Sequence, residues 1–189
     1  IELLHEGNYV YKYFIVFIIY IKYPRYPRRC ASMGKILKIN DPIHGFLLFP
    51  EFITKIVDSK EVQRLMRIRQ LSGTNHVFPG ANHTRFEHSL GVAALAQRLV
   101  TNLRDIHNID LSEDDVHDCI VAALLHDVGH GPFSHNFESI LVKNSNRDHE
   151  DLTEWIIKKS EVGDILNDLG FNKNYIAKRA TEMGFIRNT

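Results

Sequence analysis

Residues 121–135 read VAALLHDVGHGPFSH, and this stretch governs how the rest of the chain is interpreted. Its apolar first half continues a helical pattern, which Gly129 and Gly131 then end. The helix therefore stops at a polar turn that carries three histidines and an aspartate: His126, Asp127, His130 and His135. Imidazole and carboxylate together suit a divalent transition metal, and carboxylate also suits Mg²⁺. The alternative is a set of surface histidines that the helix dipole favours, but apolar residues flank the cluster on both sides.

Length and composition indicate one globular domain. The chain has 189 residues, of which 44% are apolar and 24% charged, and this argues against disorder and against a disulfide scaffold. Lys plus Arg and Asp plus Glu each number 23, so binding to nucleic acid is possible but not indicated, and a membrane is not expected. The two cysteines, Cys30 and Cys119, are interpreted as reduced thiols of a cytoplasmic protein.

The first 32 residues do not fit the pattern that follows them. The apolar stretch from Tyr13 to Ile21 is shorter than the roughly 20 residues that span a bilayer. It also lacks the basic start and the small-residue cleavage site of a signal peptide. We therefore expect residues 1–32 to be an extension outside the domain, whose deletion leaves stability unchanged or better. Residues 33–189 are expected to form the domain without its C-terminal region.

From Lys35 onward the pattern predicts helices with short polar breaks, and no convincing pair of strands. Residues 40–45 contain Asn-Asp-Pro and His-Gly, which favour a turn. Ser59 is expected to cap a helix whose one side carries Val62, Leu65, Met66 and Ile68.

Three later helices have clear start signals. Thr84 and Glu87 match a capping box, and the helix that they open points Phe86, Leu90, Leu95, Leu99 and Leu103 toward a core. Ser112 and Asp148 are the expected caps of two further helices, and the tail from residue 160 is also helical in pattern. The sequence thus predicts an all-α bundle around a divalent metal site.

Four stretches together carry a resemblance to a known family. His126-Asp127 followed by VGHGPFSH closely resembles the motif of the HD-domain phosphohydrolases. INDPIHG at 39–45, VFPGANHTRFEHSLGV at 77–92 and the QRL and RQL triplets at 63–65 and 69–71 narrow the match. In this order they are similar to the deoxynucleoside triphosphate triphosphohydrolases, the branch that includes dGTPase-like enzymes and sterile-alpha-motif/HD proteins. The resemblance covers residues 35–155.

The resemblance implies an all-α HD domain around one divalent metal ion, with Mn, Mg, Fe, Zn and Ni not distinguished. His88 resembles the first ligand of the family, and His126 with Asp127 resembles the doublet. Taken alone, a histidine at position 88 is more often a partly buried helix residue than a metal ligand. The family has a further aspartate ligand downstream, for which Asp164 and Asp168 qualify only by residue type. We therefore expect the 189 residues alone to be catalytically impaired.

The family reaction cleaves a deoxynucleoside triphosphate into a deoxynucleoside and tripolyphosphate. By resemblance, His130, His135 and His149 are catalytic, with His135 favoured as the acid for the leaving 5′ oxygen. Arg85 resembles the arginine near the substrate phosphates, and Gln70 and Leu71 resemble residues beside the sugar. Without the resemblance, Arg85 could pair with Glu87, and Leu71 could be core.

Some family members have nucleotide effector sites that drive assembly into oligomers. Asn40, Asp58 and Gln63 lie where such sites have contacts, whereas Met66 stands where that pattern has an arginine. Effector control is therefore not predicted, while a homo-oligomer is. The competing functions are another HD nucleotidase or phosphodiesterase, and a degenerate nucleotide-binding or nucleic-acid-binding module.

Overall fold

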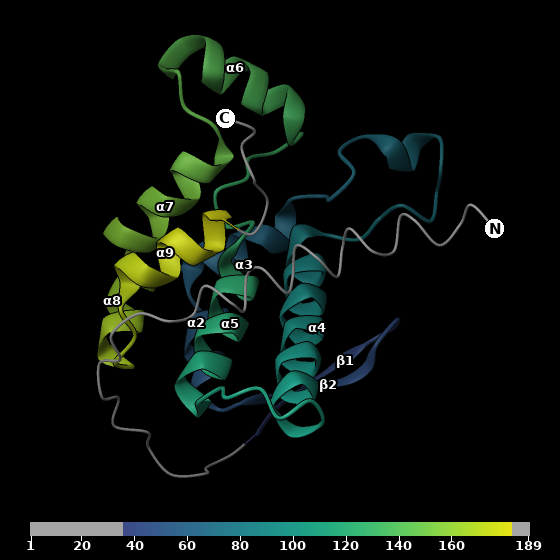
Figure 1. Cartoon of the computed structure of the whole chain (residues 1–189). Coiled ribbons are helices and arrows are strands. Elements are labelled where there is room, and N and C mark those ends of the chain that lie inside the picture. Colours follow the sequence, from purple (N-terminus) through teal and green to yellow (C-terminus); the bar gives the residue numbers. More distant parts are fainter. Residues whose placement is uncertain (1–35, 183–189) are drawn as a thin grey trace, which may run out of the picture.

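The computed structural model describes residues 36–182, apart from the side chains of His135 and Glu182. The described chain is mainly helical, which confirms the all-α expectation. It also contains one two-stranded sheet. The expected boundary at residue 32 lies outside the described residues. The elements in chain order are β1 (Ile36–Asp41), β2 (Gly45–Pro50), α2 (Phe52–Val57), α3 (Lys60–Gln63), η2 (Arg64–Arg67), η3 (Thr74–His76), α4 (Arg85–Asp105), α5 (Glu113–Leu125), α6 (His135–Ser145), α7 (His149–Lys159), α8 (Glu161–Asp168) and α9 (Lys173–Glu182) (Figure 1).

The first described element is a β-hairpin, so the prediction of no strand pair was wrong. β1 and β2 run antiparallel, with Leu37 opposite Phe49 and Ile39 opposite Leu47. Leu47 and Phe49 are buried, and the two side chains opposite them pack against the same core. Apolar side chains at every second position cover the core on one face of a pleated strand, and this spacing overrides the helical interpretation.

The turn of this hairpin is where the sequence predicted a turn. The Asp41 carboxylate accepts hydrogen bonds from the backbone amides of Ile43 and His44, at 2.9 and 2.7 Å. Gly45 then takes a φ of +72°, which a residue with a side chain rarely adopts. The sequence therefore predicted the turn correctly, although it did not predict the two strands that the turn connects.

Three helix starts confirm the predicted caps. Capping boxes of Thr84 with Glu87 and of Ser112 with Asp115 begin α4 and α5. The Asp148 side chain caps α7 by accepting from two backbone amides of its first turn. Each cap satisfies amides that have no partner inside the helix, so these three starts are fixed locally.

The helix expected after Ser59 is short, and the prediction that the Ser59 side chain caps it was wrong, because that side chain makes no cap hydrogen bond. The Ser59 hydroxyl donates to the backbone carbonyl of Ile56, and α3 passes at once into the 3₁₀ turn η2. Val62, Leu65 and Ile68 are buried as expected, whereas Met66 is exposed.

α4 and α5 lie side by side and form the centre of the molecule (Figure 1). Both helices carry buried alanines, which are Ala93, Ala94 and Ala96 on α4 and Ala122 and Ala123 on α5. The predicted core residues of α4 contact the core, except Leu95, which is 49% exposed; its prediction was wrong. α9 packs against both α5 and α7.

α6 stands away from this core, beyond the ends of α4 and α5 (Figure 1). None of its described side chains is buried. The thiol of Cys119, on α5, is free and its burial raises its pKa to about 12, while Cys30 lies outside the described residues. No helix between residues 36 and 182 has the length and apolarity needed to cross a membrane.

Candidate metal and phosphate site

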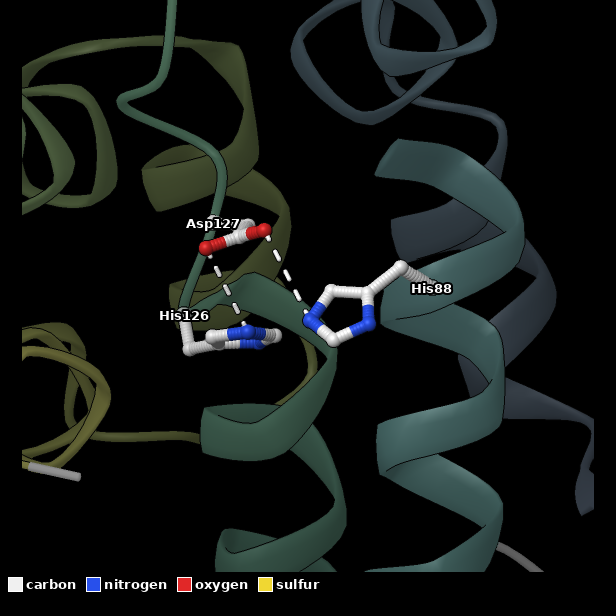
Figure 2. A group of neighbouring side chains, drawn as sticks. All are labelled: His88, His126 and Asp127. Atoms are coloured by element: carbon white, nitrogen blue, oxygen red, sulfur yellow. Dashed lines mark ion pairs between the residues drawn. The ribbon is translucent and has the colours of Figure 1, made fainter. Parts of the chain in front are cut away.

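The three expected metal ligands come together where α4 begins and α5 ends. His88 lies in the first turn of α4, while His126 and Asp127 follow directly on the last residue of α5. Because the two helices lie side by side, the start of one meets the end of the other. One nitrogen or oxygen atom from each residue lies within 4.8 Å of the others (Figure 2).

Both imidazole rings turn toward the Asp127 carboxylate (Figure 2). Nε2 of His126 lies 3.3 Å from Oδ1 of Asp127, and Nε2 of His88 lies 3.8 Å from Oδ2. Nδ1 of His126 is hydrogen-bonded at 2.7 Å to the backbone carbonyl of Ala123, so it donates a proton there. In the neutral ring this tautomer leaves the lone pair on Nε2, the nitrogen that faces Asp127, as a metal ligand requires.

Arg85 forms hydrogen bonds with buried side chains beside this group and not with Glu87. Its Nη1 donates to Oδ2 of Asp127 at 2.5 Å, and its Nη2 donates to the hydroxyl of Ser134 at 2.6 Å. Both Arg85 and Asp127 are buried, and Glu87 is used in the cap of α4. The alternative of a surface salt bridge between Arg85 and Glu87 is therefore wrong.

The protonation states around Asp127 suit a cation. Burial would raise the pKa of Asp127, but the hydrogen bond from His130 and the charges of His126 and Arg85 outweigh it, and the pKa lies well below its usual range. Burial lowers the pKa of His88, which Asp127 only partly opposes. An ionised carboxylate and a neutral imidazole are the forms that bind metals.

A second group of side chains lies beside the first and includes two of the predicted catalytic histidines. The rings of His130 and His149 stack at 4.0 Å, and Nε2 of His130 is 3.4 Å from Oδ1 of Asp127. Nδ1 of His149 lies 2.5 Å from a carboxylate oxygen of Glu138, on α6. Burial lowers the pKa of His130, so its ring is neutral. These contacts and the burial of Asp127 and His130 argue against a set of surface histidines.

A cavity of about 270 Å³ opens between the two groups. The residues that line it are His88, Val92, His126, Asp127, His149, Glu150, Ala180 and Thr181. The last two come from α9, so the end of the described chain reaches the same cavity.

The remaining predicted site residues are placed less directly. His135 begins α6, but its side chain lies outside the described residues. The backbone amide of Gln70 donates to the carbonyl of His83, which brings Gln70 to the end of α4 that carries Arg85. Leu71 is 46% exposed, so it is not core.

The positions that resemble effector-site contacts lie on other elements. Asn40 lies on β1, Asp58 follows the last residue of α2, and Gln63 is the last residue of α3, where its amide donates to the carbonyl of Val57 at 2.8 Å. Asp164, on α8, is exposed and lies 3.8 Å from Lys173. Within residues 36–182, neither Asp164 nor Asp168 belongs to the group of metal-ligand atoms.

Sequence reasoning missed three side chains that hold the site. Glu138 bonds His149, Ser134 bonds Arg85, and Thr153 bonds the backbone of the turn after α5. Glu138 follows His135 by three residues and could have been noticed as a carboxylate just beyond the motif. Ser134, inside the motif, and Thr153, beyond it, have partners that the sequence does not indicate, because these partners are distant in sequence.

Comparison with known proteins agrees with this geometry. Residues 85–178 match the family described as HD domain. The chain is 52% identical over 101 residues to "Deoxynucleoside triphosphate triphosphohydrolase SAMHD1" of Bos taurus. This alignment covers 53% of this chain and 17% of that protein. It is 39% identical over 145 residues to the protein of the same name from Gallus gallus, covering 71% and 24%.

A bacterial relative gives a similar match. The chain is 42% identical over 138 residues to "Uncharacterized protein YwfO" of Bacillus subtilis, covering 71% of this chain and 30% of that protein. The chain thus spans 17% to 30% of the length of these three relatives.

Proposed function

Because the chain belongs to the HD-domain phosphohydrolases, we propose that it acts on deoxynucleoside triphosphates and releases deoxynucleoside and tripolyphosphate. The observation that carries this proposal is the convergence of His88, His126 and Asp127 on one cavity, beside the stacked pair of His130 and His149. The names of the relatives supply the substrate class, which comes to this chain only as part of the proposal.

The donor set fits a divalent metal ion. Two imidazole nitrogens and one ionised carboxylate face a common point, and these are ligands that Mn²⁺, Fe²⁺ and Zn²⁺ accept. We propose that His88, His126 and Asp127 hold the ion. When bound, it would supply Lewis-acid activation of water and positive charge for the phosphoryl oxygens.

Arg85 has two tasks in this proposal. A guanidinium has five N–H donors, and the hydrogen bonds to Asp127 and Ser134 use two of them. The buried Nε of Arg85 has no hydrogen-bond partner in the described chain. Arg85 thus fixes the orientation of Asp127 and keeps donors for the oxygens of a triphosphate.

The histidines handle phosphate and protons. Water adds to the α-phosphorus, the bond to the 5′ oxygen breaks, and that oxygen must receive a proton. Glu138 accepts from Nδ1 of His149, which leaves Nε2 of His149 for a phosphate oxygen or for water. Following the sequence prediction, we assign the proton of the leaving oxygen to His135.

The test is product analysis in ¹⁸O-labelled water, with the full chain, Mn²⁺ and each of the four deoxynucleoside triphosphates. We expect intact tripolyphosphate that carries the label, together with unlabelled deoxynucleoside. Orthophosphate or pyrophosphate as the sole initial product would assign the site to another HD phosphatase. Because the 189 residues alone are expected to be impaired, the assay is repeated with a chain extended through the downstream helical region. Binding of Mn²⁺ and nucleotide without turnover in both chains would instead favour a binding module.

Assembly into a homo-oligomer and a cytoplasmic location are further proposals that rest on the sequence. Sedimentation of the full chain with and without nucleotide tests the first of them. A monomer under both conditions would contradict it.

A further inference from the structure

We propose that Thr153 is a positioning residue, whose hydroxyl holds the first turn of α7, and with it His149, against the turn after α5. The inference rests on the proposed function for the role of His149. It concerns a residue that the sequence did not single out and that does not line the cavity.

The Thr153 hydroxyl makes two hydrogen bonds to the end of α5. It accepts from the backbone amide of Gly129 at 3.0 Å and donates to the backbone carbonyl of His126 at 3.3 Å. Carbonyls at the end of a helix, and amides just beyond it, lack partners within that helix. One side chain from α7 thus completes the hydrogen bonding of the turn that carries two proposed ligands.

The two backbones are also in direct contact at this point. A Cβ atom on Gly129 would lie 2.2 Å from the carbonyl oxygen of His149 and 2.4 Å from the backbone nitrogen of Thr153. The first turn of α7 therefore lies directly on the turn after α5, with no space between them for a side chain at Gly129.

This contact sets where the His149 ring can stand. His149 and Thr153 are four residues apart on α7 and so lie on the same side of the helix. The His149 ring stacks on His130, whose Nε2 in turn faces Asp127. A shift of α7 would therefore separate the stacked pair while the ligands on α4 and α5 stay in place.

Ordinary packing of α7 is supplied by another residue. Ile157, one turn further along, is fully buried and belongs to the hydrophobic core. Thr153 is equally buried, but its hydroxyl bonds backbone groups. Valine has nearly the shape of threonine and lacks the hydroxyl, so Thr153→Val separates the two roles.

The experiment compares Thr153→Val, Thr153→Ser and Ile157→Val in the full chain. Histidine ring resonances are recorded by NMR with labelled histidine, and those of His130 and His149 are assigned from their glutamine variants. We expect Thr153→Val to move both resonances, Thr153→Ser to keep them, and Ile157→Val to keep them. In the nucleotide assay, we expect kcat of Thr153→Val to fall about tenfold with KM within about twofold, and serine to rescue it.

Unchanged ring resonances in Thr153→Val, or equal changes in Ile157→Val, would overturn the proposal. If the wild-type chain shows no turnover, as the expected impairment of the 189 residues alone allows, the ring resonances still decide the role of Thr153. If Thr153→Val does not fold, hydrogen exchange of the Gly129 amide in the wild-type protein decides it. Slow exchange supports the buried bond to Thr153, and exchange as fast as in an open loop contradicts it.

Discussion

The α4–α5 pair and the α6–α7 segment both contribute to the site, but they are supported in different ways. The first region carries the three proposed metal ligands, His88, His126 and Asp127. Its two helices lie at the centre of the core and carry buried alanines. Glu138 stands on α6, which has no described buried side chain, and His149 begins the helix that follows.

This difference separates two properties that a metal-dependent hydrolase needs. Ligands on core helices keep their geometry without help from substrate, so metal affinity depends on the ligands themselves. The groups that we propose to contact phosphate are held by a few polar contacts, namely Glu138 with His149 and Thr153 with Gly129. We therefore expect that substitutions in the second region change turnover while they leave metal binding intact.

The largest expected effect is that of Asp127→Asn. It removes an anionic ligand and leaves the buried Arg85 guanidinium without its carboxylate, which costs about 3–5 kcal/mol of folding stability. Affinity for Mn²⁺, measured by calorimetry or EPR, should fall by more than about 100-fold, since even changes to groups behind the ligands cost 10- to 100-fold. Thermal unfolding measures the stability loss.

Asp164→Asn is the matched control. Its side chain is 79% exposed on α8, so both the unfolding free energy and the Mn²⁺ affinity should stay at wild-type values. Wild-type affinity in Asp127→Asn would remove Asp127 from the ligand set.

Gly129→Ala tests the contact between the two regions. The added Cβ would collide with the backbone of α7 rather than with a side chain that could move. We expect a loss of about 3 kcal/mol in unfolding free energy, at the upper end for overpacking. Gly80→Ala is the control, because a Cβ there meets nothing within 4 Å. Equal stability of the two variants would mean that α7 is free to move away from the turn.

Local start signals could be predicted from the sequence, and tertiary supports could not. Thr84, Ser112 and Asp148 cap helices through residues two or three positions away, so the pattern was sufficient. Leu95 was misassigned because leucine spacing alone did not show which face of α4 is buried. The hairpin was missed because its short apolar runs also fit a helix.

The same limit applies to the site. The spacing of the motif, together with the resemblance, predicted His88, His126 and Asp127, and the structure brings these three together. The roles of His130, His149 and Arg85 stay predictions, although the structure places them beside that group. What the sequence could not supply was a partner on a different element, such as Ser134 for Arg85.

Glu138→Gln is expected to affect turnover alone. The neutral amide oxygen of glutamine accepts the hydrogen bond from Nδ1 of His149 less strongly than the carboxylate and orients the ring less firmly. We therefore expect kcat to fall by roughly 100-fold, the lower end for proton-transfer groups. Affinity for Mn²⁺ should stay within about twofold of wild type. Glu154→Gln, which breaks the pair of Glu154 with Lys158 further along α7, should change neither quantity. A parallel loss of Mn²⁺ affinity in Glu138→Gln would show that the two regions are not separable.

The smallest expected effect compares the support of the two regions directly. Ile140, on α6, is 61% exposed, so Ile140→Ala removes little buried area and should change the unfolding free energy by less than about 0.5 kcal/mol. Ile120, on α5, is 1% exposed, and Ile120→Ala should cost about 2–5 kcal/mol because a cavity forms in the core. Chemical denaturation of both variants measures the difference, provided that the unfolding free energy depends on denaturant concentration with the same slope in both. A large loss in Ile140→Ala would mean that the outer face of α6 is covered in solution, by another part of the chain or by a second copy. In that case α6 would be a supported element, and the phosphate-side groups would resist substitution as firmly as the metal ligands do.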